Sequence, residues 1–190
     1  MLAGNFSAAA PAFKKALQIE PKKIAYSNLG LMYYYLGQLD ESIATHQLAI
    51  ELEPGDHLAW SNLGDALSIA GRSDEAREAF ETARGHAQEA LSVNPNDPFY
   101  SMDLAWIEAM LGNTVNARTL MNRALDLAPD DPYTHYYNAL VFLRAGDQDA
   151  ALSALQVSVD GGYARQLIAA EPLLAPLRSY EAFSEIIDAN

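Results

Sequence analysis

The sequence contains no cysteine, which excludes disulfides, thiolate metal ligands and cysteine nucleophiles. It is also poor in basic residues: 12 Lys and Arg stand against 25 Asp and Glu, for a formal net charge of −13. So acidic a chain lacks the positive surface that binds a phosphate backbone or an anionic membrane. No apolar run approaches the ~18 residues needed to cross a bilayer. We therefore expect neither nucleic-acid binding nor membrane insertion.

The start of the chain has no basic segment followed by an apolar core, so a signal peptide is not expected. We therefore expect a cytoplasmic protein. A periplasmic location stays open if the full-length protein carries an upstream membrane segment.

Catalytic and metal-binding signatures are also missing. The sequence has no phosphate-binding loop, nucleophile elbow or dinucleotide fingerprint. The four histidines show no zinc-ligand spacing: His46, His57, His86 and His135. Asp130 and Asp131, with Asp126 nearby, could suggest a cation, but a turn and helix N-cap before Pro132 explains them better. We expect no enzyme, no catalytic residue, no cofactor and no metal site.

One small basic cluster departs from the acidic composition. It consists of Lys14, Lys15, Lys22 and Lys23. A solvated helix end accounts for it better than a binding patch does.

The segment from Trp60 to Ala83 predicts a pair of helices. Its first apolar face is Trp60, Leu63, Gly64 and Leu67, at helical spacing. Gly71 ends that helix, and a second face follows with Ala76, Phe80 and Ala83. Large residues on one helix meet small residues on the other, so close packing is expected. Such a pair cannot bury both of its faces alone and requires neighbours.

The neighbouring segments repeat this pattern every 34 residues. Leu29-Gly30 precedes Leu63-Gly64 by 34, and Pro95 precedes Pro129 by the same interval. A period of 34 with Trp-x-x-Leu-Gly, a later Ala-x-x-x-Phe and a closing proline resembles the tetratricopeptide repeat family. The resemblance implies an all-α fold, a right-handed superhelical solenoid of antiparallel helix pairs with a C-terminal helical cap.

The repeats predict a single domain over residues 1–190 with six parts. These are a half repeat (1–22), a repeat (23–56), a repeat with a seven-residue helix extension (57–97), a repeat (98–131), a divergent repeat (132–162) and a helical cap (163–190). The half repeat supplies a second helix, at about Asn5 to Ile19, whose partner would precede Met1.

The second repeat closes seven residues late, at Pro95 instead of near residue 88. Seven residues are close to two helical turns, so the apolar face is kept. We expect one helix from about Ser73 to Val93, longer by roughly 10 Å. A break at Arg84-Gly85-His86 is the alternative.

The cap region resembles the end of the tetratricopeptide arrays in bacterial multidomain signalling proteins. The segments that carry this likeness are Gly162-Tyr163, Glu171-Pro172-x-Leu174-x-x-Leu177-Arg178 and Phe183. The resemblance implies a bacterial protein-interaction scaffold within a larger signalling or regulatory protein.

In this family the first helices line a concave groove, which implies a set of partner-binding residues. They are Asn28, Leu31, Tyr34, Tyr35, Asn62, Asp65, Phe99, Met102, Asp103, Trp106, Tyr133, Tyr136 and Tyr137. For Phe99, Trp106, Tyr34 and Tyr136 a place in the core is an equal alternative. Counted from Lys23 and His57 as position 1 of their repeats, Asn28 and Asn62 stand at position 6, as in family members that clamp a peptide's C-terminal carboxylate. Those members also have Lys or Arg at positions 2 and 5, where this sequence has Ile24, Leu58, Ser27 and Ser61, so the clamp is not expected here.

We therefore expect a module that binds a protein or peptide in its groove. The alternatives are a homodimer through the N-terminal half repeat, or a spacer fused to an upstream kinase-like or cyclase-like domain.

Overall fold

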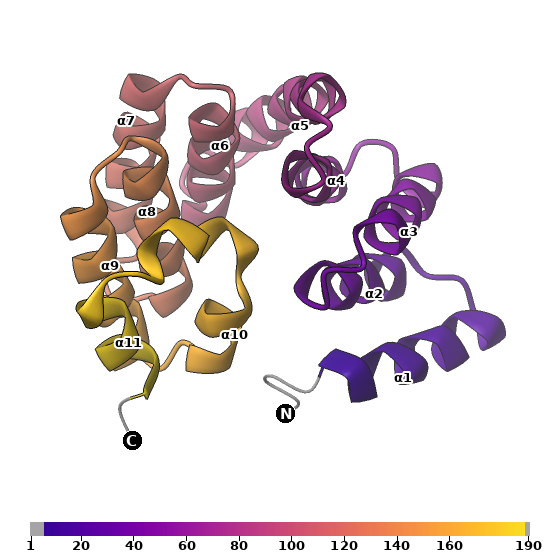
Figure 1. Cartoon of the computed structure of the whole chain (residues 1–190). Helices are drawn as coiled ribbons and strands as arrows, with labels where there is room; N and C mark the ends of the chain where they lie inside the picture. The colour runs from indigo at the N-terminus through magenta and orange to yellow at the C-terminus, as the bar shows by residue number, and fades with distance from the viewer. Residues whose placement is uncertain (1–5, 189–190) are drawn as a thin grey trace. The chain divides into compact units, whose positions relative to one another are not determined.

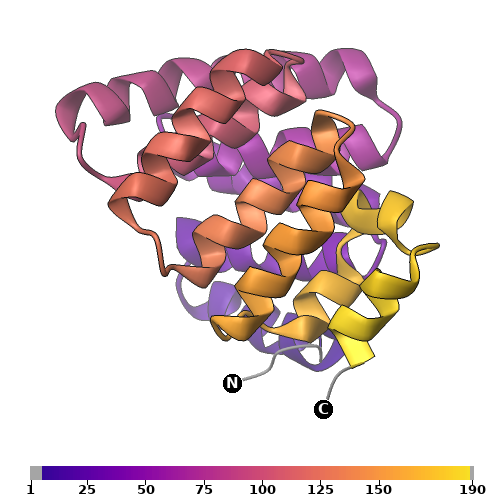
Figure 2. The same cartoon turned by 90° about the vertical axis from the view of Figure 1, so that its left-hand side faces the viewer.

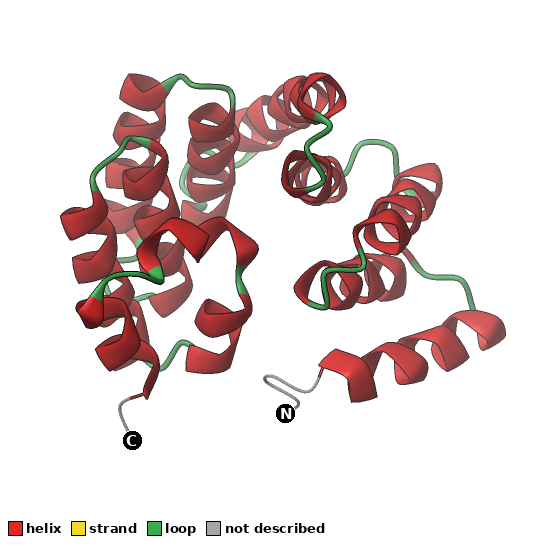
Figure 3. Ribbon diagram, viewed as in Figure 1, coloured by secondary structure: helices red, strands yellow, loops and turns green. Residues whose placement is uncertain are grey.

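The computed structural model describes residues 6–188, in which the secondary structure is helical and contains no strand (Figures 1 and 3). The helices are α1 (Phe6–Ile19), α2 (Lys23–Tyr35), α3 (Leu39–Leu52), α4 (His57–Ile69), α5 (Ser73–Val93), α6 (Pro98–Met110), α7 (Thr114–Leu127), α8 (Pro132–Arg144), α9 (Gln148–Asp160), α10 (Arg165–Ala170), the 3-10 helix η1 (Pro172–Leu177) and α11 (Glu181–Asp188). The all-α prediction is confirmed.

The chain forms two compact units, Met1–His86 and Ala87–Asn190. We call them unit 1 and unit 2. Helix α5 contributes residues to both. The predicted boundaries of the repeats stay a prediction.

A left-handed glycine ends the first helix of each whole pair. The glycines are Gly37 (φ 70°), Gly71 (φ 76°), Gly112 (φ 84°) and Gly146 (φ 82°). At Gly71 the backbone N–H donates to the carbonyl of Ser68 at 3.1 Å, and the next N–H donates to Leu67 at 2.9 Å. These bonds satisfy carbonyls at the helix end, and the positive φ favours a residue without Cβ.

Aspartates cap the starts of α4, α6 and α8, the first helices of the last three pairs. Asp131 Oδ2 accepts a hydrogen bond from the Thr134 backbone N–H at 2.7 Å, and Asp97 Oδ1 accepts one from Phe99 at 2.9 Å. Each cap satisfies an N–H group that has no partner within its helix. The interpretation of Asp131 as an N-cap is confirmed.

Close packing between paired helices explains the Leu-Gly motif. A Cβ added at Gly64 would lie 2.8 Å from the ring of Phe80, on the partner helix. In the preceding pair, a Cβ at Gly30 would lie 2.6 Å from His46 Cε1. Only a glycine allows the ring to sit this close to the facing backbone. His46 therefore takes the place in its repeat that Phe80 takes in the next.

Helix α5 is continuous from Ser73 to Val93, so the long-helix prediction is confirmed and the break at Gly85 does not occur. Gly85 is exposed, and a Cβ there would meet nothing within 4 Å. The seven extra residues extend the helix without interrupting it.

The half repeat forms α1, which packs against α2. Ala10 lies in a small apolar cluster with Leu29 and Tyr33 of α2. The ring of Phe6 stacks on Tyr35 at a centroid distance of 4.8 Å. Thus α1 covers α2 as the second helix of a preceding repeat would.

Unit 2 has a continuous core shared by its helix pairs and the cap. Antiparallel α8 and α9, drawn in orange in Figure 2, pack side by side. Trp106, Met121 and Leu155 from the helix pairs are buried in one cluster with residues of the cap. The cap contributes Ile168, Leu174, Leu177, Phe183 and Ile186 to that cluster. The cap thereby covers the apolar face of the last pair.

Candidate partner-binding surfaces

The predicted groove residues divide into buried and accessible sets. The buried set is Tyr34 (4% exposed), Met102 (0%), Asp103 (6%), Trp106 (2%) and Tyr136 (4%). These side chains pack inside the folded chain and offer a partner almost no surface. For Tyr34, Trp106 and Tyr136 the structure therefore supports the core alternative over the groove.

The other eight predicted groove residues are accessible to a partner. Phe99 and Tyr133 are exposed by 44% and 39%. Six more side chains are half-buried: Asn28, Leu31, Tyr35, Asn62, Asp65 and Tyr137. Partner binding by these eight residues stays a prediction.

In unit 2 the exposed Tyr133 belongs to a group of four packed rings, which we call the tyrosine cluster: Tyr133, Tyr136, Tyr137 and Tyr163. Tyr136 and Tyr163 stack at 4.6 Å with an interplanar angle of 10°. The Tyr133 ring lies 5.0 Å from Tyr137 and 6.2 Å from Tyr163. Trp106 meets the edge of Tyr137 at 6.3 Å. Stacked and edge-on rings of this kind fix one another in place.

A buried carboxylate anchors this cluster to the cap. Glu171 is 3% exposed, and its Oε2 accepts a hydrogen bond from the Tyr136 hydroxyl at 2.8 Å. Its Oε1 accepts the Leu173 backbone N–H at 3.1 Å, at the start of η1. The repeat pattern does not indicate Glu171 as a residue that supports the site, because no spacing in the sequence links it to Tyr136.

The repeat pattern does not indicate Tyr163 either, since it lies in the cap and outside the repeat register. Burial raises its pKa above the ordinary value of 10.0, and nearby Tyr133 and Glu171 raise it further. The hydroxyl therefore stays protonated and remains available as a hydrogen-bond donor. Its ring completes the tyrosine cluster from the cap side.

In unit 1 the position-6 asparagines, Asn28 and Asn62, lie on α2 and α4, which contact each other. At repeat position 2 the exposed side chains are apolar: Ile24 is 59% and Leu58 41% exposed. A carboxylate clamp requires a cation where these aliphatic groups stand. The accessible residues of unit 1 therefore suit an apolar or amide-bearing partner better than a terminal carboxylate.

Three of the four lysines of the basic cluster, Lys14, Lys22 and Lys23, have partners within unit 1. Lys23 Nζ lies 2.8 Å from Asp56 and 3.3 Å from Glu53. Lys22 pairs with Glu20 at 2.9 Å, and Lys14 Nζ lies 5.2 Å from the centroid of the Tyr33 ring. These contacts support the interpretation of the cluster as helix-end charge.

Residues 6–188 offer neither a membrane-spanning helix nor a metal-binding group. No helix in that range combines the length and the apolar character that a membrane crossing requires. The same residues hold no group of three His, Cys, Asp or Glu side chains placed to share a metal ion.

The helix pairs define a helical-repeat protein, and its exposed rings Phe99 and Tyr133 form what we call the aromatic face of unit 2. Two family models, both described as tetratricopeptide repeat, match residues 24–56 and 55–130. Together they cover more than half of the chain, which belongs to the tetratricopeptide repeat family.

Curated relatives share part of this chain. Small glutamine-rich tetratricopeptide repeat-containing protein 2 of Mycosarcoma maydis is 30% identical over 60% of this chain and 31% of its own length. The peroxisomal targeting signal receptor of Candida glabrata is 38% identical over 29% of this chain and 9% of its own length. The chain thus spans less than a third of each of these two relatives.

Solved structures share the fold. TTC0263, a thermophilic tetratricopeptide repeat protein of Thermus thermophilus, has a TM-score of 0.62 and 21% identity, covering 90% of this chain and 91% of that one. A chain of the APC/C hetero-tetramer Cut9–Hcn1 has a TM-score of 0.57 and 17% identity, covering 97% of this chain and 36% of that one.

Proposed function

We propose that this chain is a protein-interaction module whose partner, a peptide or a folded domain, binds the aromatic face of unit 2. The observation that carries the proposal is the exposure of Phe99 and Tyr133. They occupy the same repeat position on α6 and α8, two helices that contact each other. The Tyr133 ring stacks on buried Tyr136 at a centroid distance of 6.5 Å and lies 5.0 Å from Tyr137, so this exposed ring is held in place before a partner binds.

Family membership supports the same conclusion. Tetratricopeptide repeats are interaction modules, and one relative is named for a targeting signal that it receives. The proposal gives the chain no catalytic role. It places the chain inside a larger bacterial signalling or regulatory protein, on the likeness of its cap to such arrays.

A pull-down with the chain as bait tests the proposal. We would compare the native chain with a Phe99→Ala, Tyr133→Ala double variant and identify captured proteins by mass spectrometry. A Val157→Ala variant is the matched control, because Val157 is 47% exposed on α9, outside the tyrosine cluster. A protein captured by the native chain and the control but lost from the double variant would support the aromatic face. Equal capture by all three would refute it.

Self-association through the N-terminal half repeat is a second candidate, favoured by exposed aliphatic side chains near that end. Ile19 is 81% exposed at the end of α1, and Ile24 is 59% exposed on α2. Sedimentation velocity over a concentration series decides it. A sedimentation coefficient that rises with concentration, and stops rising in an Ile19→Lys variant, would support a dimer; a constant monomer value would exclude one.

A further inference from the structure

Glu108 is an acidic residue at a repeat position that is otherwise apolar. It is the eleventh residue counted from Pro98; in the other repeats that position holds Tyr33, Leu67 and Phe142. Glu108 is nevertheless 4% exposed, as buried as the 4% of Leu67. A buried carboxylate is costly unless hydrogen bonds compensate for its lost hydration. Its presence therefore calls for an explanation beyond packing.

Asn113 provides part of that compensation. Asn113 Nδ2 donates to Glu108 Oε2 at 2.6 Å, and the Asn113 backbone N–H donates to the Glu108 carbonyl at 2.8 Å. As a result Asn113, the N-cap residue of α7, makes no side-chain capping bond. The Asn113 side chain thus hydrogen-bonds to the Glu108 carboxylate and does not cap the N-terminus of α7.

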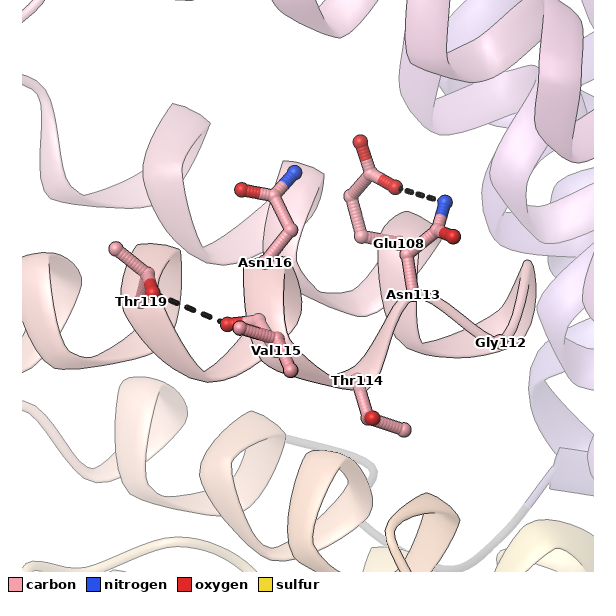
Figure 4. Close-up of a pocket in the computed structure, with 7 residues that line it drawn as sticks. All are labelled: Glu108, Gly112, Asn113, Thr114, Val115, Asn116 and Thr119. Carbon is pink, nitrogen blue, oxygen red and sulfur yellow. Dashed lines mark hydrogen bonds between the residues drawn. The ribbon is translucent and has the colours of Figure 1, made fainter.

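The other carboxylate oxygen, Oε1, points away from Asn113 in Figure 4. Within residues 6–188 no hydrogen bond to it is formed. Glu108 lines an open pocket of about 550 Å³, together with Asn113, Thr114, Val115, Asn116 and Thr119. The buried carboxylate therefore keeps an acceptor available at the wall of a pocket.

The formal charge of the pocket lining is negative. Glu108 is the charged side chain among its lining residues. The C-terminal end of α6 and the N-terminal end of α7 both adjoin it, and their partial charges have opposite signs. Because those partial charges offset each other, the carboxylate sets the sign of the site. Amide and hydroxyl oxygens of Asn116, Thr114 and Thr119 can add neutral acceptors.

We propose that this pocket binds a primary ammonium group, supplied by a lysine side chain of a protein partner. A guanidinium binds a carboxylate best through both oxygens, and Asn113 already occupies Oε2. An ammonium needs only one carboxylate oxygen and can direct its other N–H groups to neutral acceptors. The exposed methyl groups of Val115 would contact the aliphatic stem of the lysine.

Titrations followed by NMR of the full ¹⁵N-labelled chain test this site. The probe is Nα-acetyl-lysine methylamide, whose one charge is the side-chain ammonium. The comparison probes are its Nε-acetylated form, the matching arginine derivative, and glycine methylamide, which carries an ammonium without the stem. We expect the lysine probe to shift the Asn113 and Asn116 amide signals, and to bind more tightly than each comparison probe.

Two variants separate binding from folding. Glu108→Gln should weaken lysine binding by about tenfold, because it removes the charge and keeps the shape. Glu185→Gln, an exposed site on α11, is the control and should bind like the native chain. Glu108→Leu restores the apolar residue of the other repeats, so it should abolish lysine binding without lowering the melting temperature. Equal binding by the Glu108→Gln chain, or equal binding of acetylated lysine or arginine, would overturn the proposal.

Discussion

The hydroxyl of Tyr136 on α8 donates a 2.8 Å hydrogen bond to the carboxylate of Glu171, the cap residue that precedes η1. Both side chains are buried. Because Glu171 also accepts the Leu173 N–H, one carboxylate joins the last helix pair to the cap and fixes the start of η1. The tyrosine cluster therefore depends on a residue 35 positions further along the chain.

Removing the hydroxyl should destabilise the fold. Tyr136→Phe keeps the ring but leaves a buried carboxylate oxygen without this donor, at an expected cost of about 1–3 kcal/mol. Urea unfolding measures the loss. Tyr180→Phe, at a ring that is 39% exposed, is the control and should change little. Equal stabilities for Tyr136→Phe and the native chain would show that the bond contributes nothing.

His46 should make the fold sensitive to acid. Burial lowers the pKa of His46 from 6.5 to about 4, and neither ring nitrogen has a hydrogen-bond partner within residues 6–188. The unfolded chain protonates His46 more readily than the folded chain does. The contribution of neutral His46 to the free energy of unfolding is therefore fully present above pH 6.5 and is lost as the pH falls toward 4. The loss should reach roughly 3 kcal/mol.

His46→Phe tests this assignment, because Phe80 occupies the equivalent place opposite Gly64. Unfolding free energies of both proteins would be measured between pH 7 and 4. The variant should lose less stability over that range than the native chain. Identical pH profiles would assign the acid sensitivity to other groups.

Alanine substitution should affect mainly stability at Trp106 and mainly partner binding at Tyr133. Trp106 is 2% exposed, so Trp106→Ala should cost about 3–5 kcal/mol of stability. Tyr133 is 39% exposed, so Tyr133→Ala should lose much less stability and instead weaken partner capture. Thermal melts and pull-downs on the same preparations distinguish the two. A stable Trp106→Ala chain that loses its partner would return Trp106 to the binding surface.

Alanine substitution at two glycines should change the stability in opposite directions. Gly85 is an exposed residue within α5 with open space around its Cβ position, so Gly85→Ala should raise stability by about 1 kcal/mol. Gly30→Ala would place a Cβ 2.6 Å from His46 and force the helices apart, so it should lower stability. Denaturant midpoints of the two variants provide the comparison. A destabilised Gly85→Ala chain would contradict the open environment at that site.

Much of the fold follows from the sequence because the repeat pattern constrains it at several levels. The spacing of Trp60, Leu63 and Gly64 specifies a helix face, and Gly71 specifies its end. The shift of Pro95 by seven residues is enough to predict a long α5, since two turns preserve the apolar face.

The site is harder to predict, because repeat position indicates the direction of a side chain and not its exposure. Trp106 and Tyr133 both hold groove positions, yet neighbouring rings bury one and leave the other accessible. Tyr163 and Glu171 belong to the cap, where the register of the repeats no longer applies. Glu108 could have been found by comparing repeat positions for a charged residue among apolar ones.

The packing of α1 against α2 has a consequence for how the fold opens. Among residues 6–188, the helix against which α1 mainly packs is α2, so detaching α1 breaks chiefly this one interface. Backbone amides of α1 should accordingly exchange their hydrogens for deuterium sooner than those of α6, whose residues 101–109 are all buried. Detachment would uncover Leu29 and Tyr33 on α2. A chain in that opened state would present an apolar end with a tendency to aggregate.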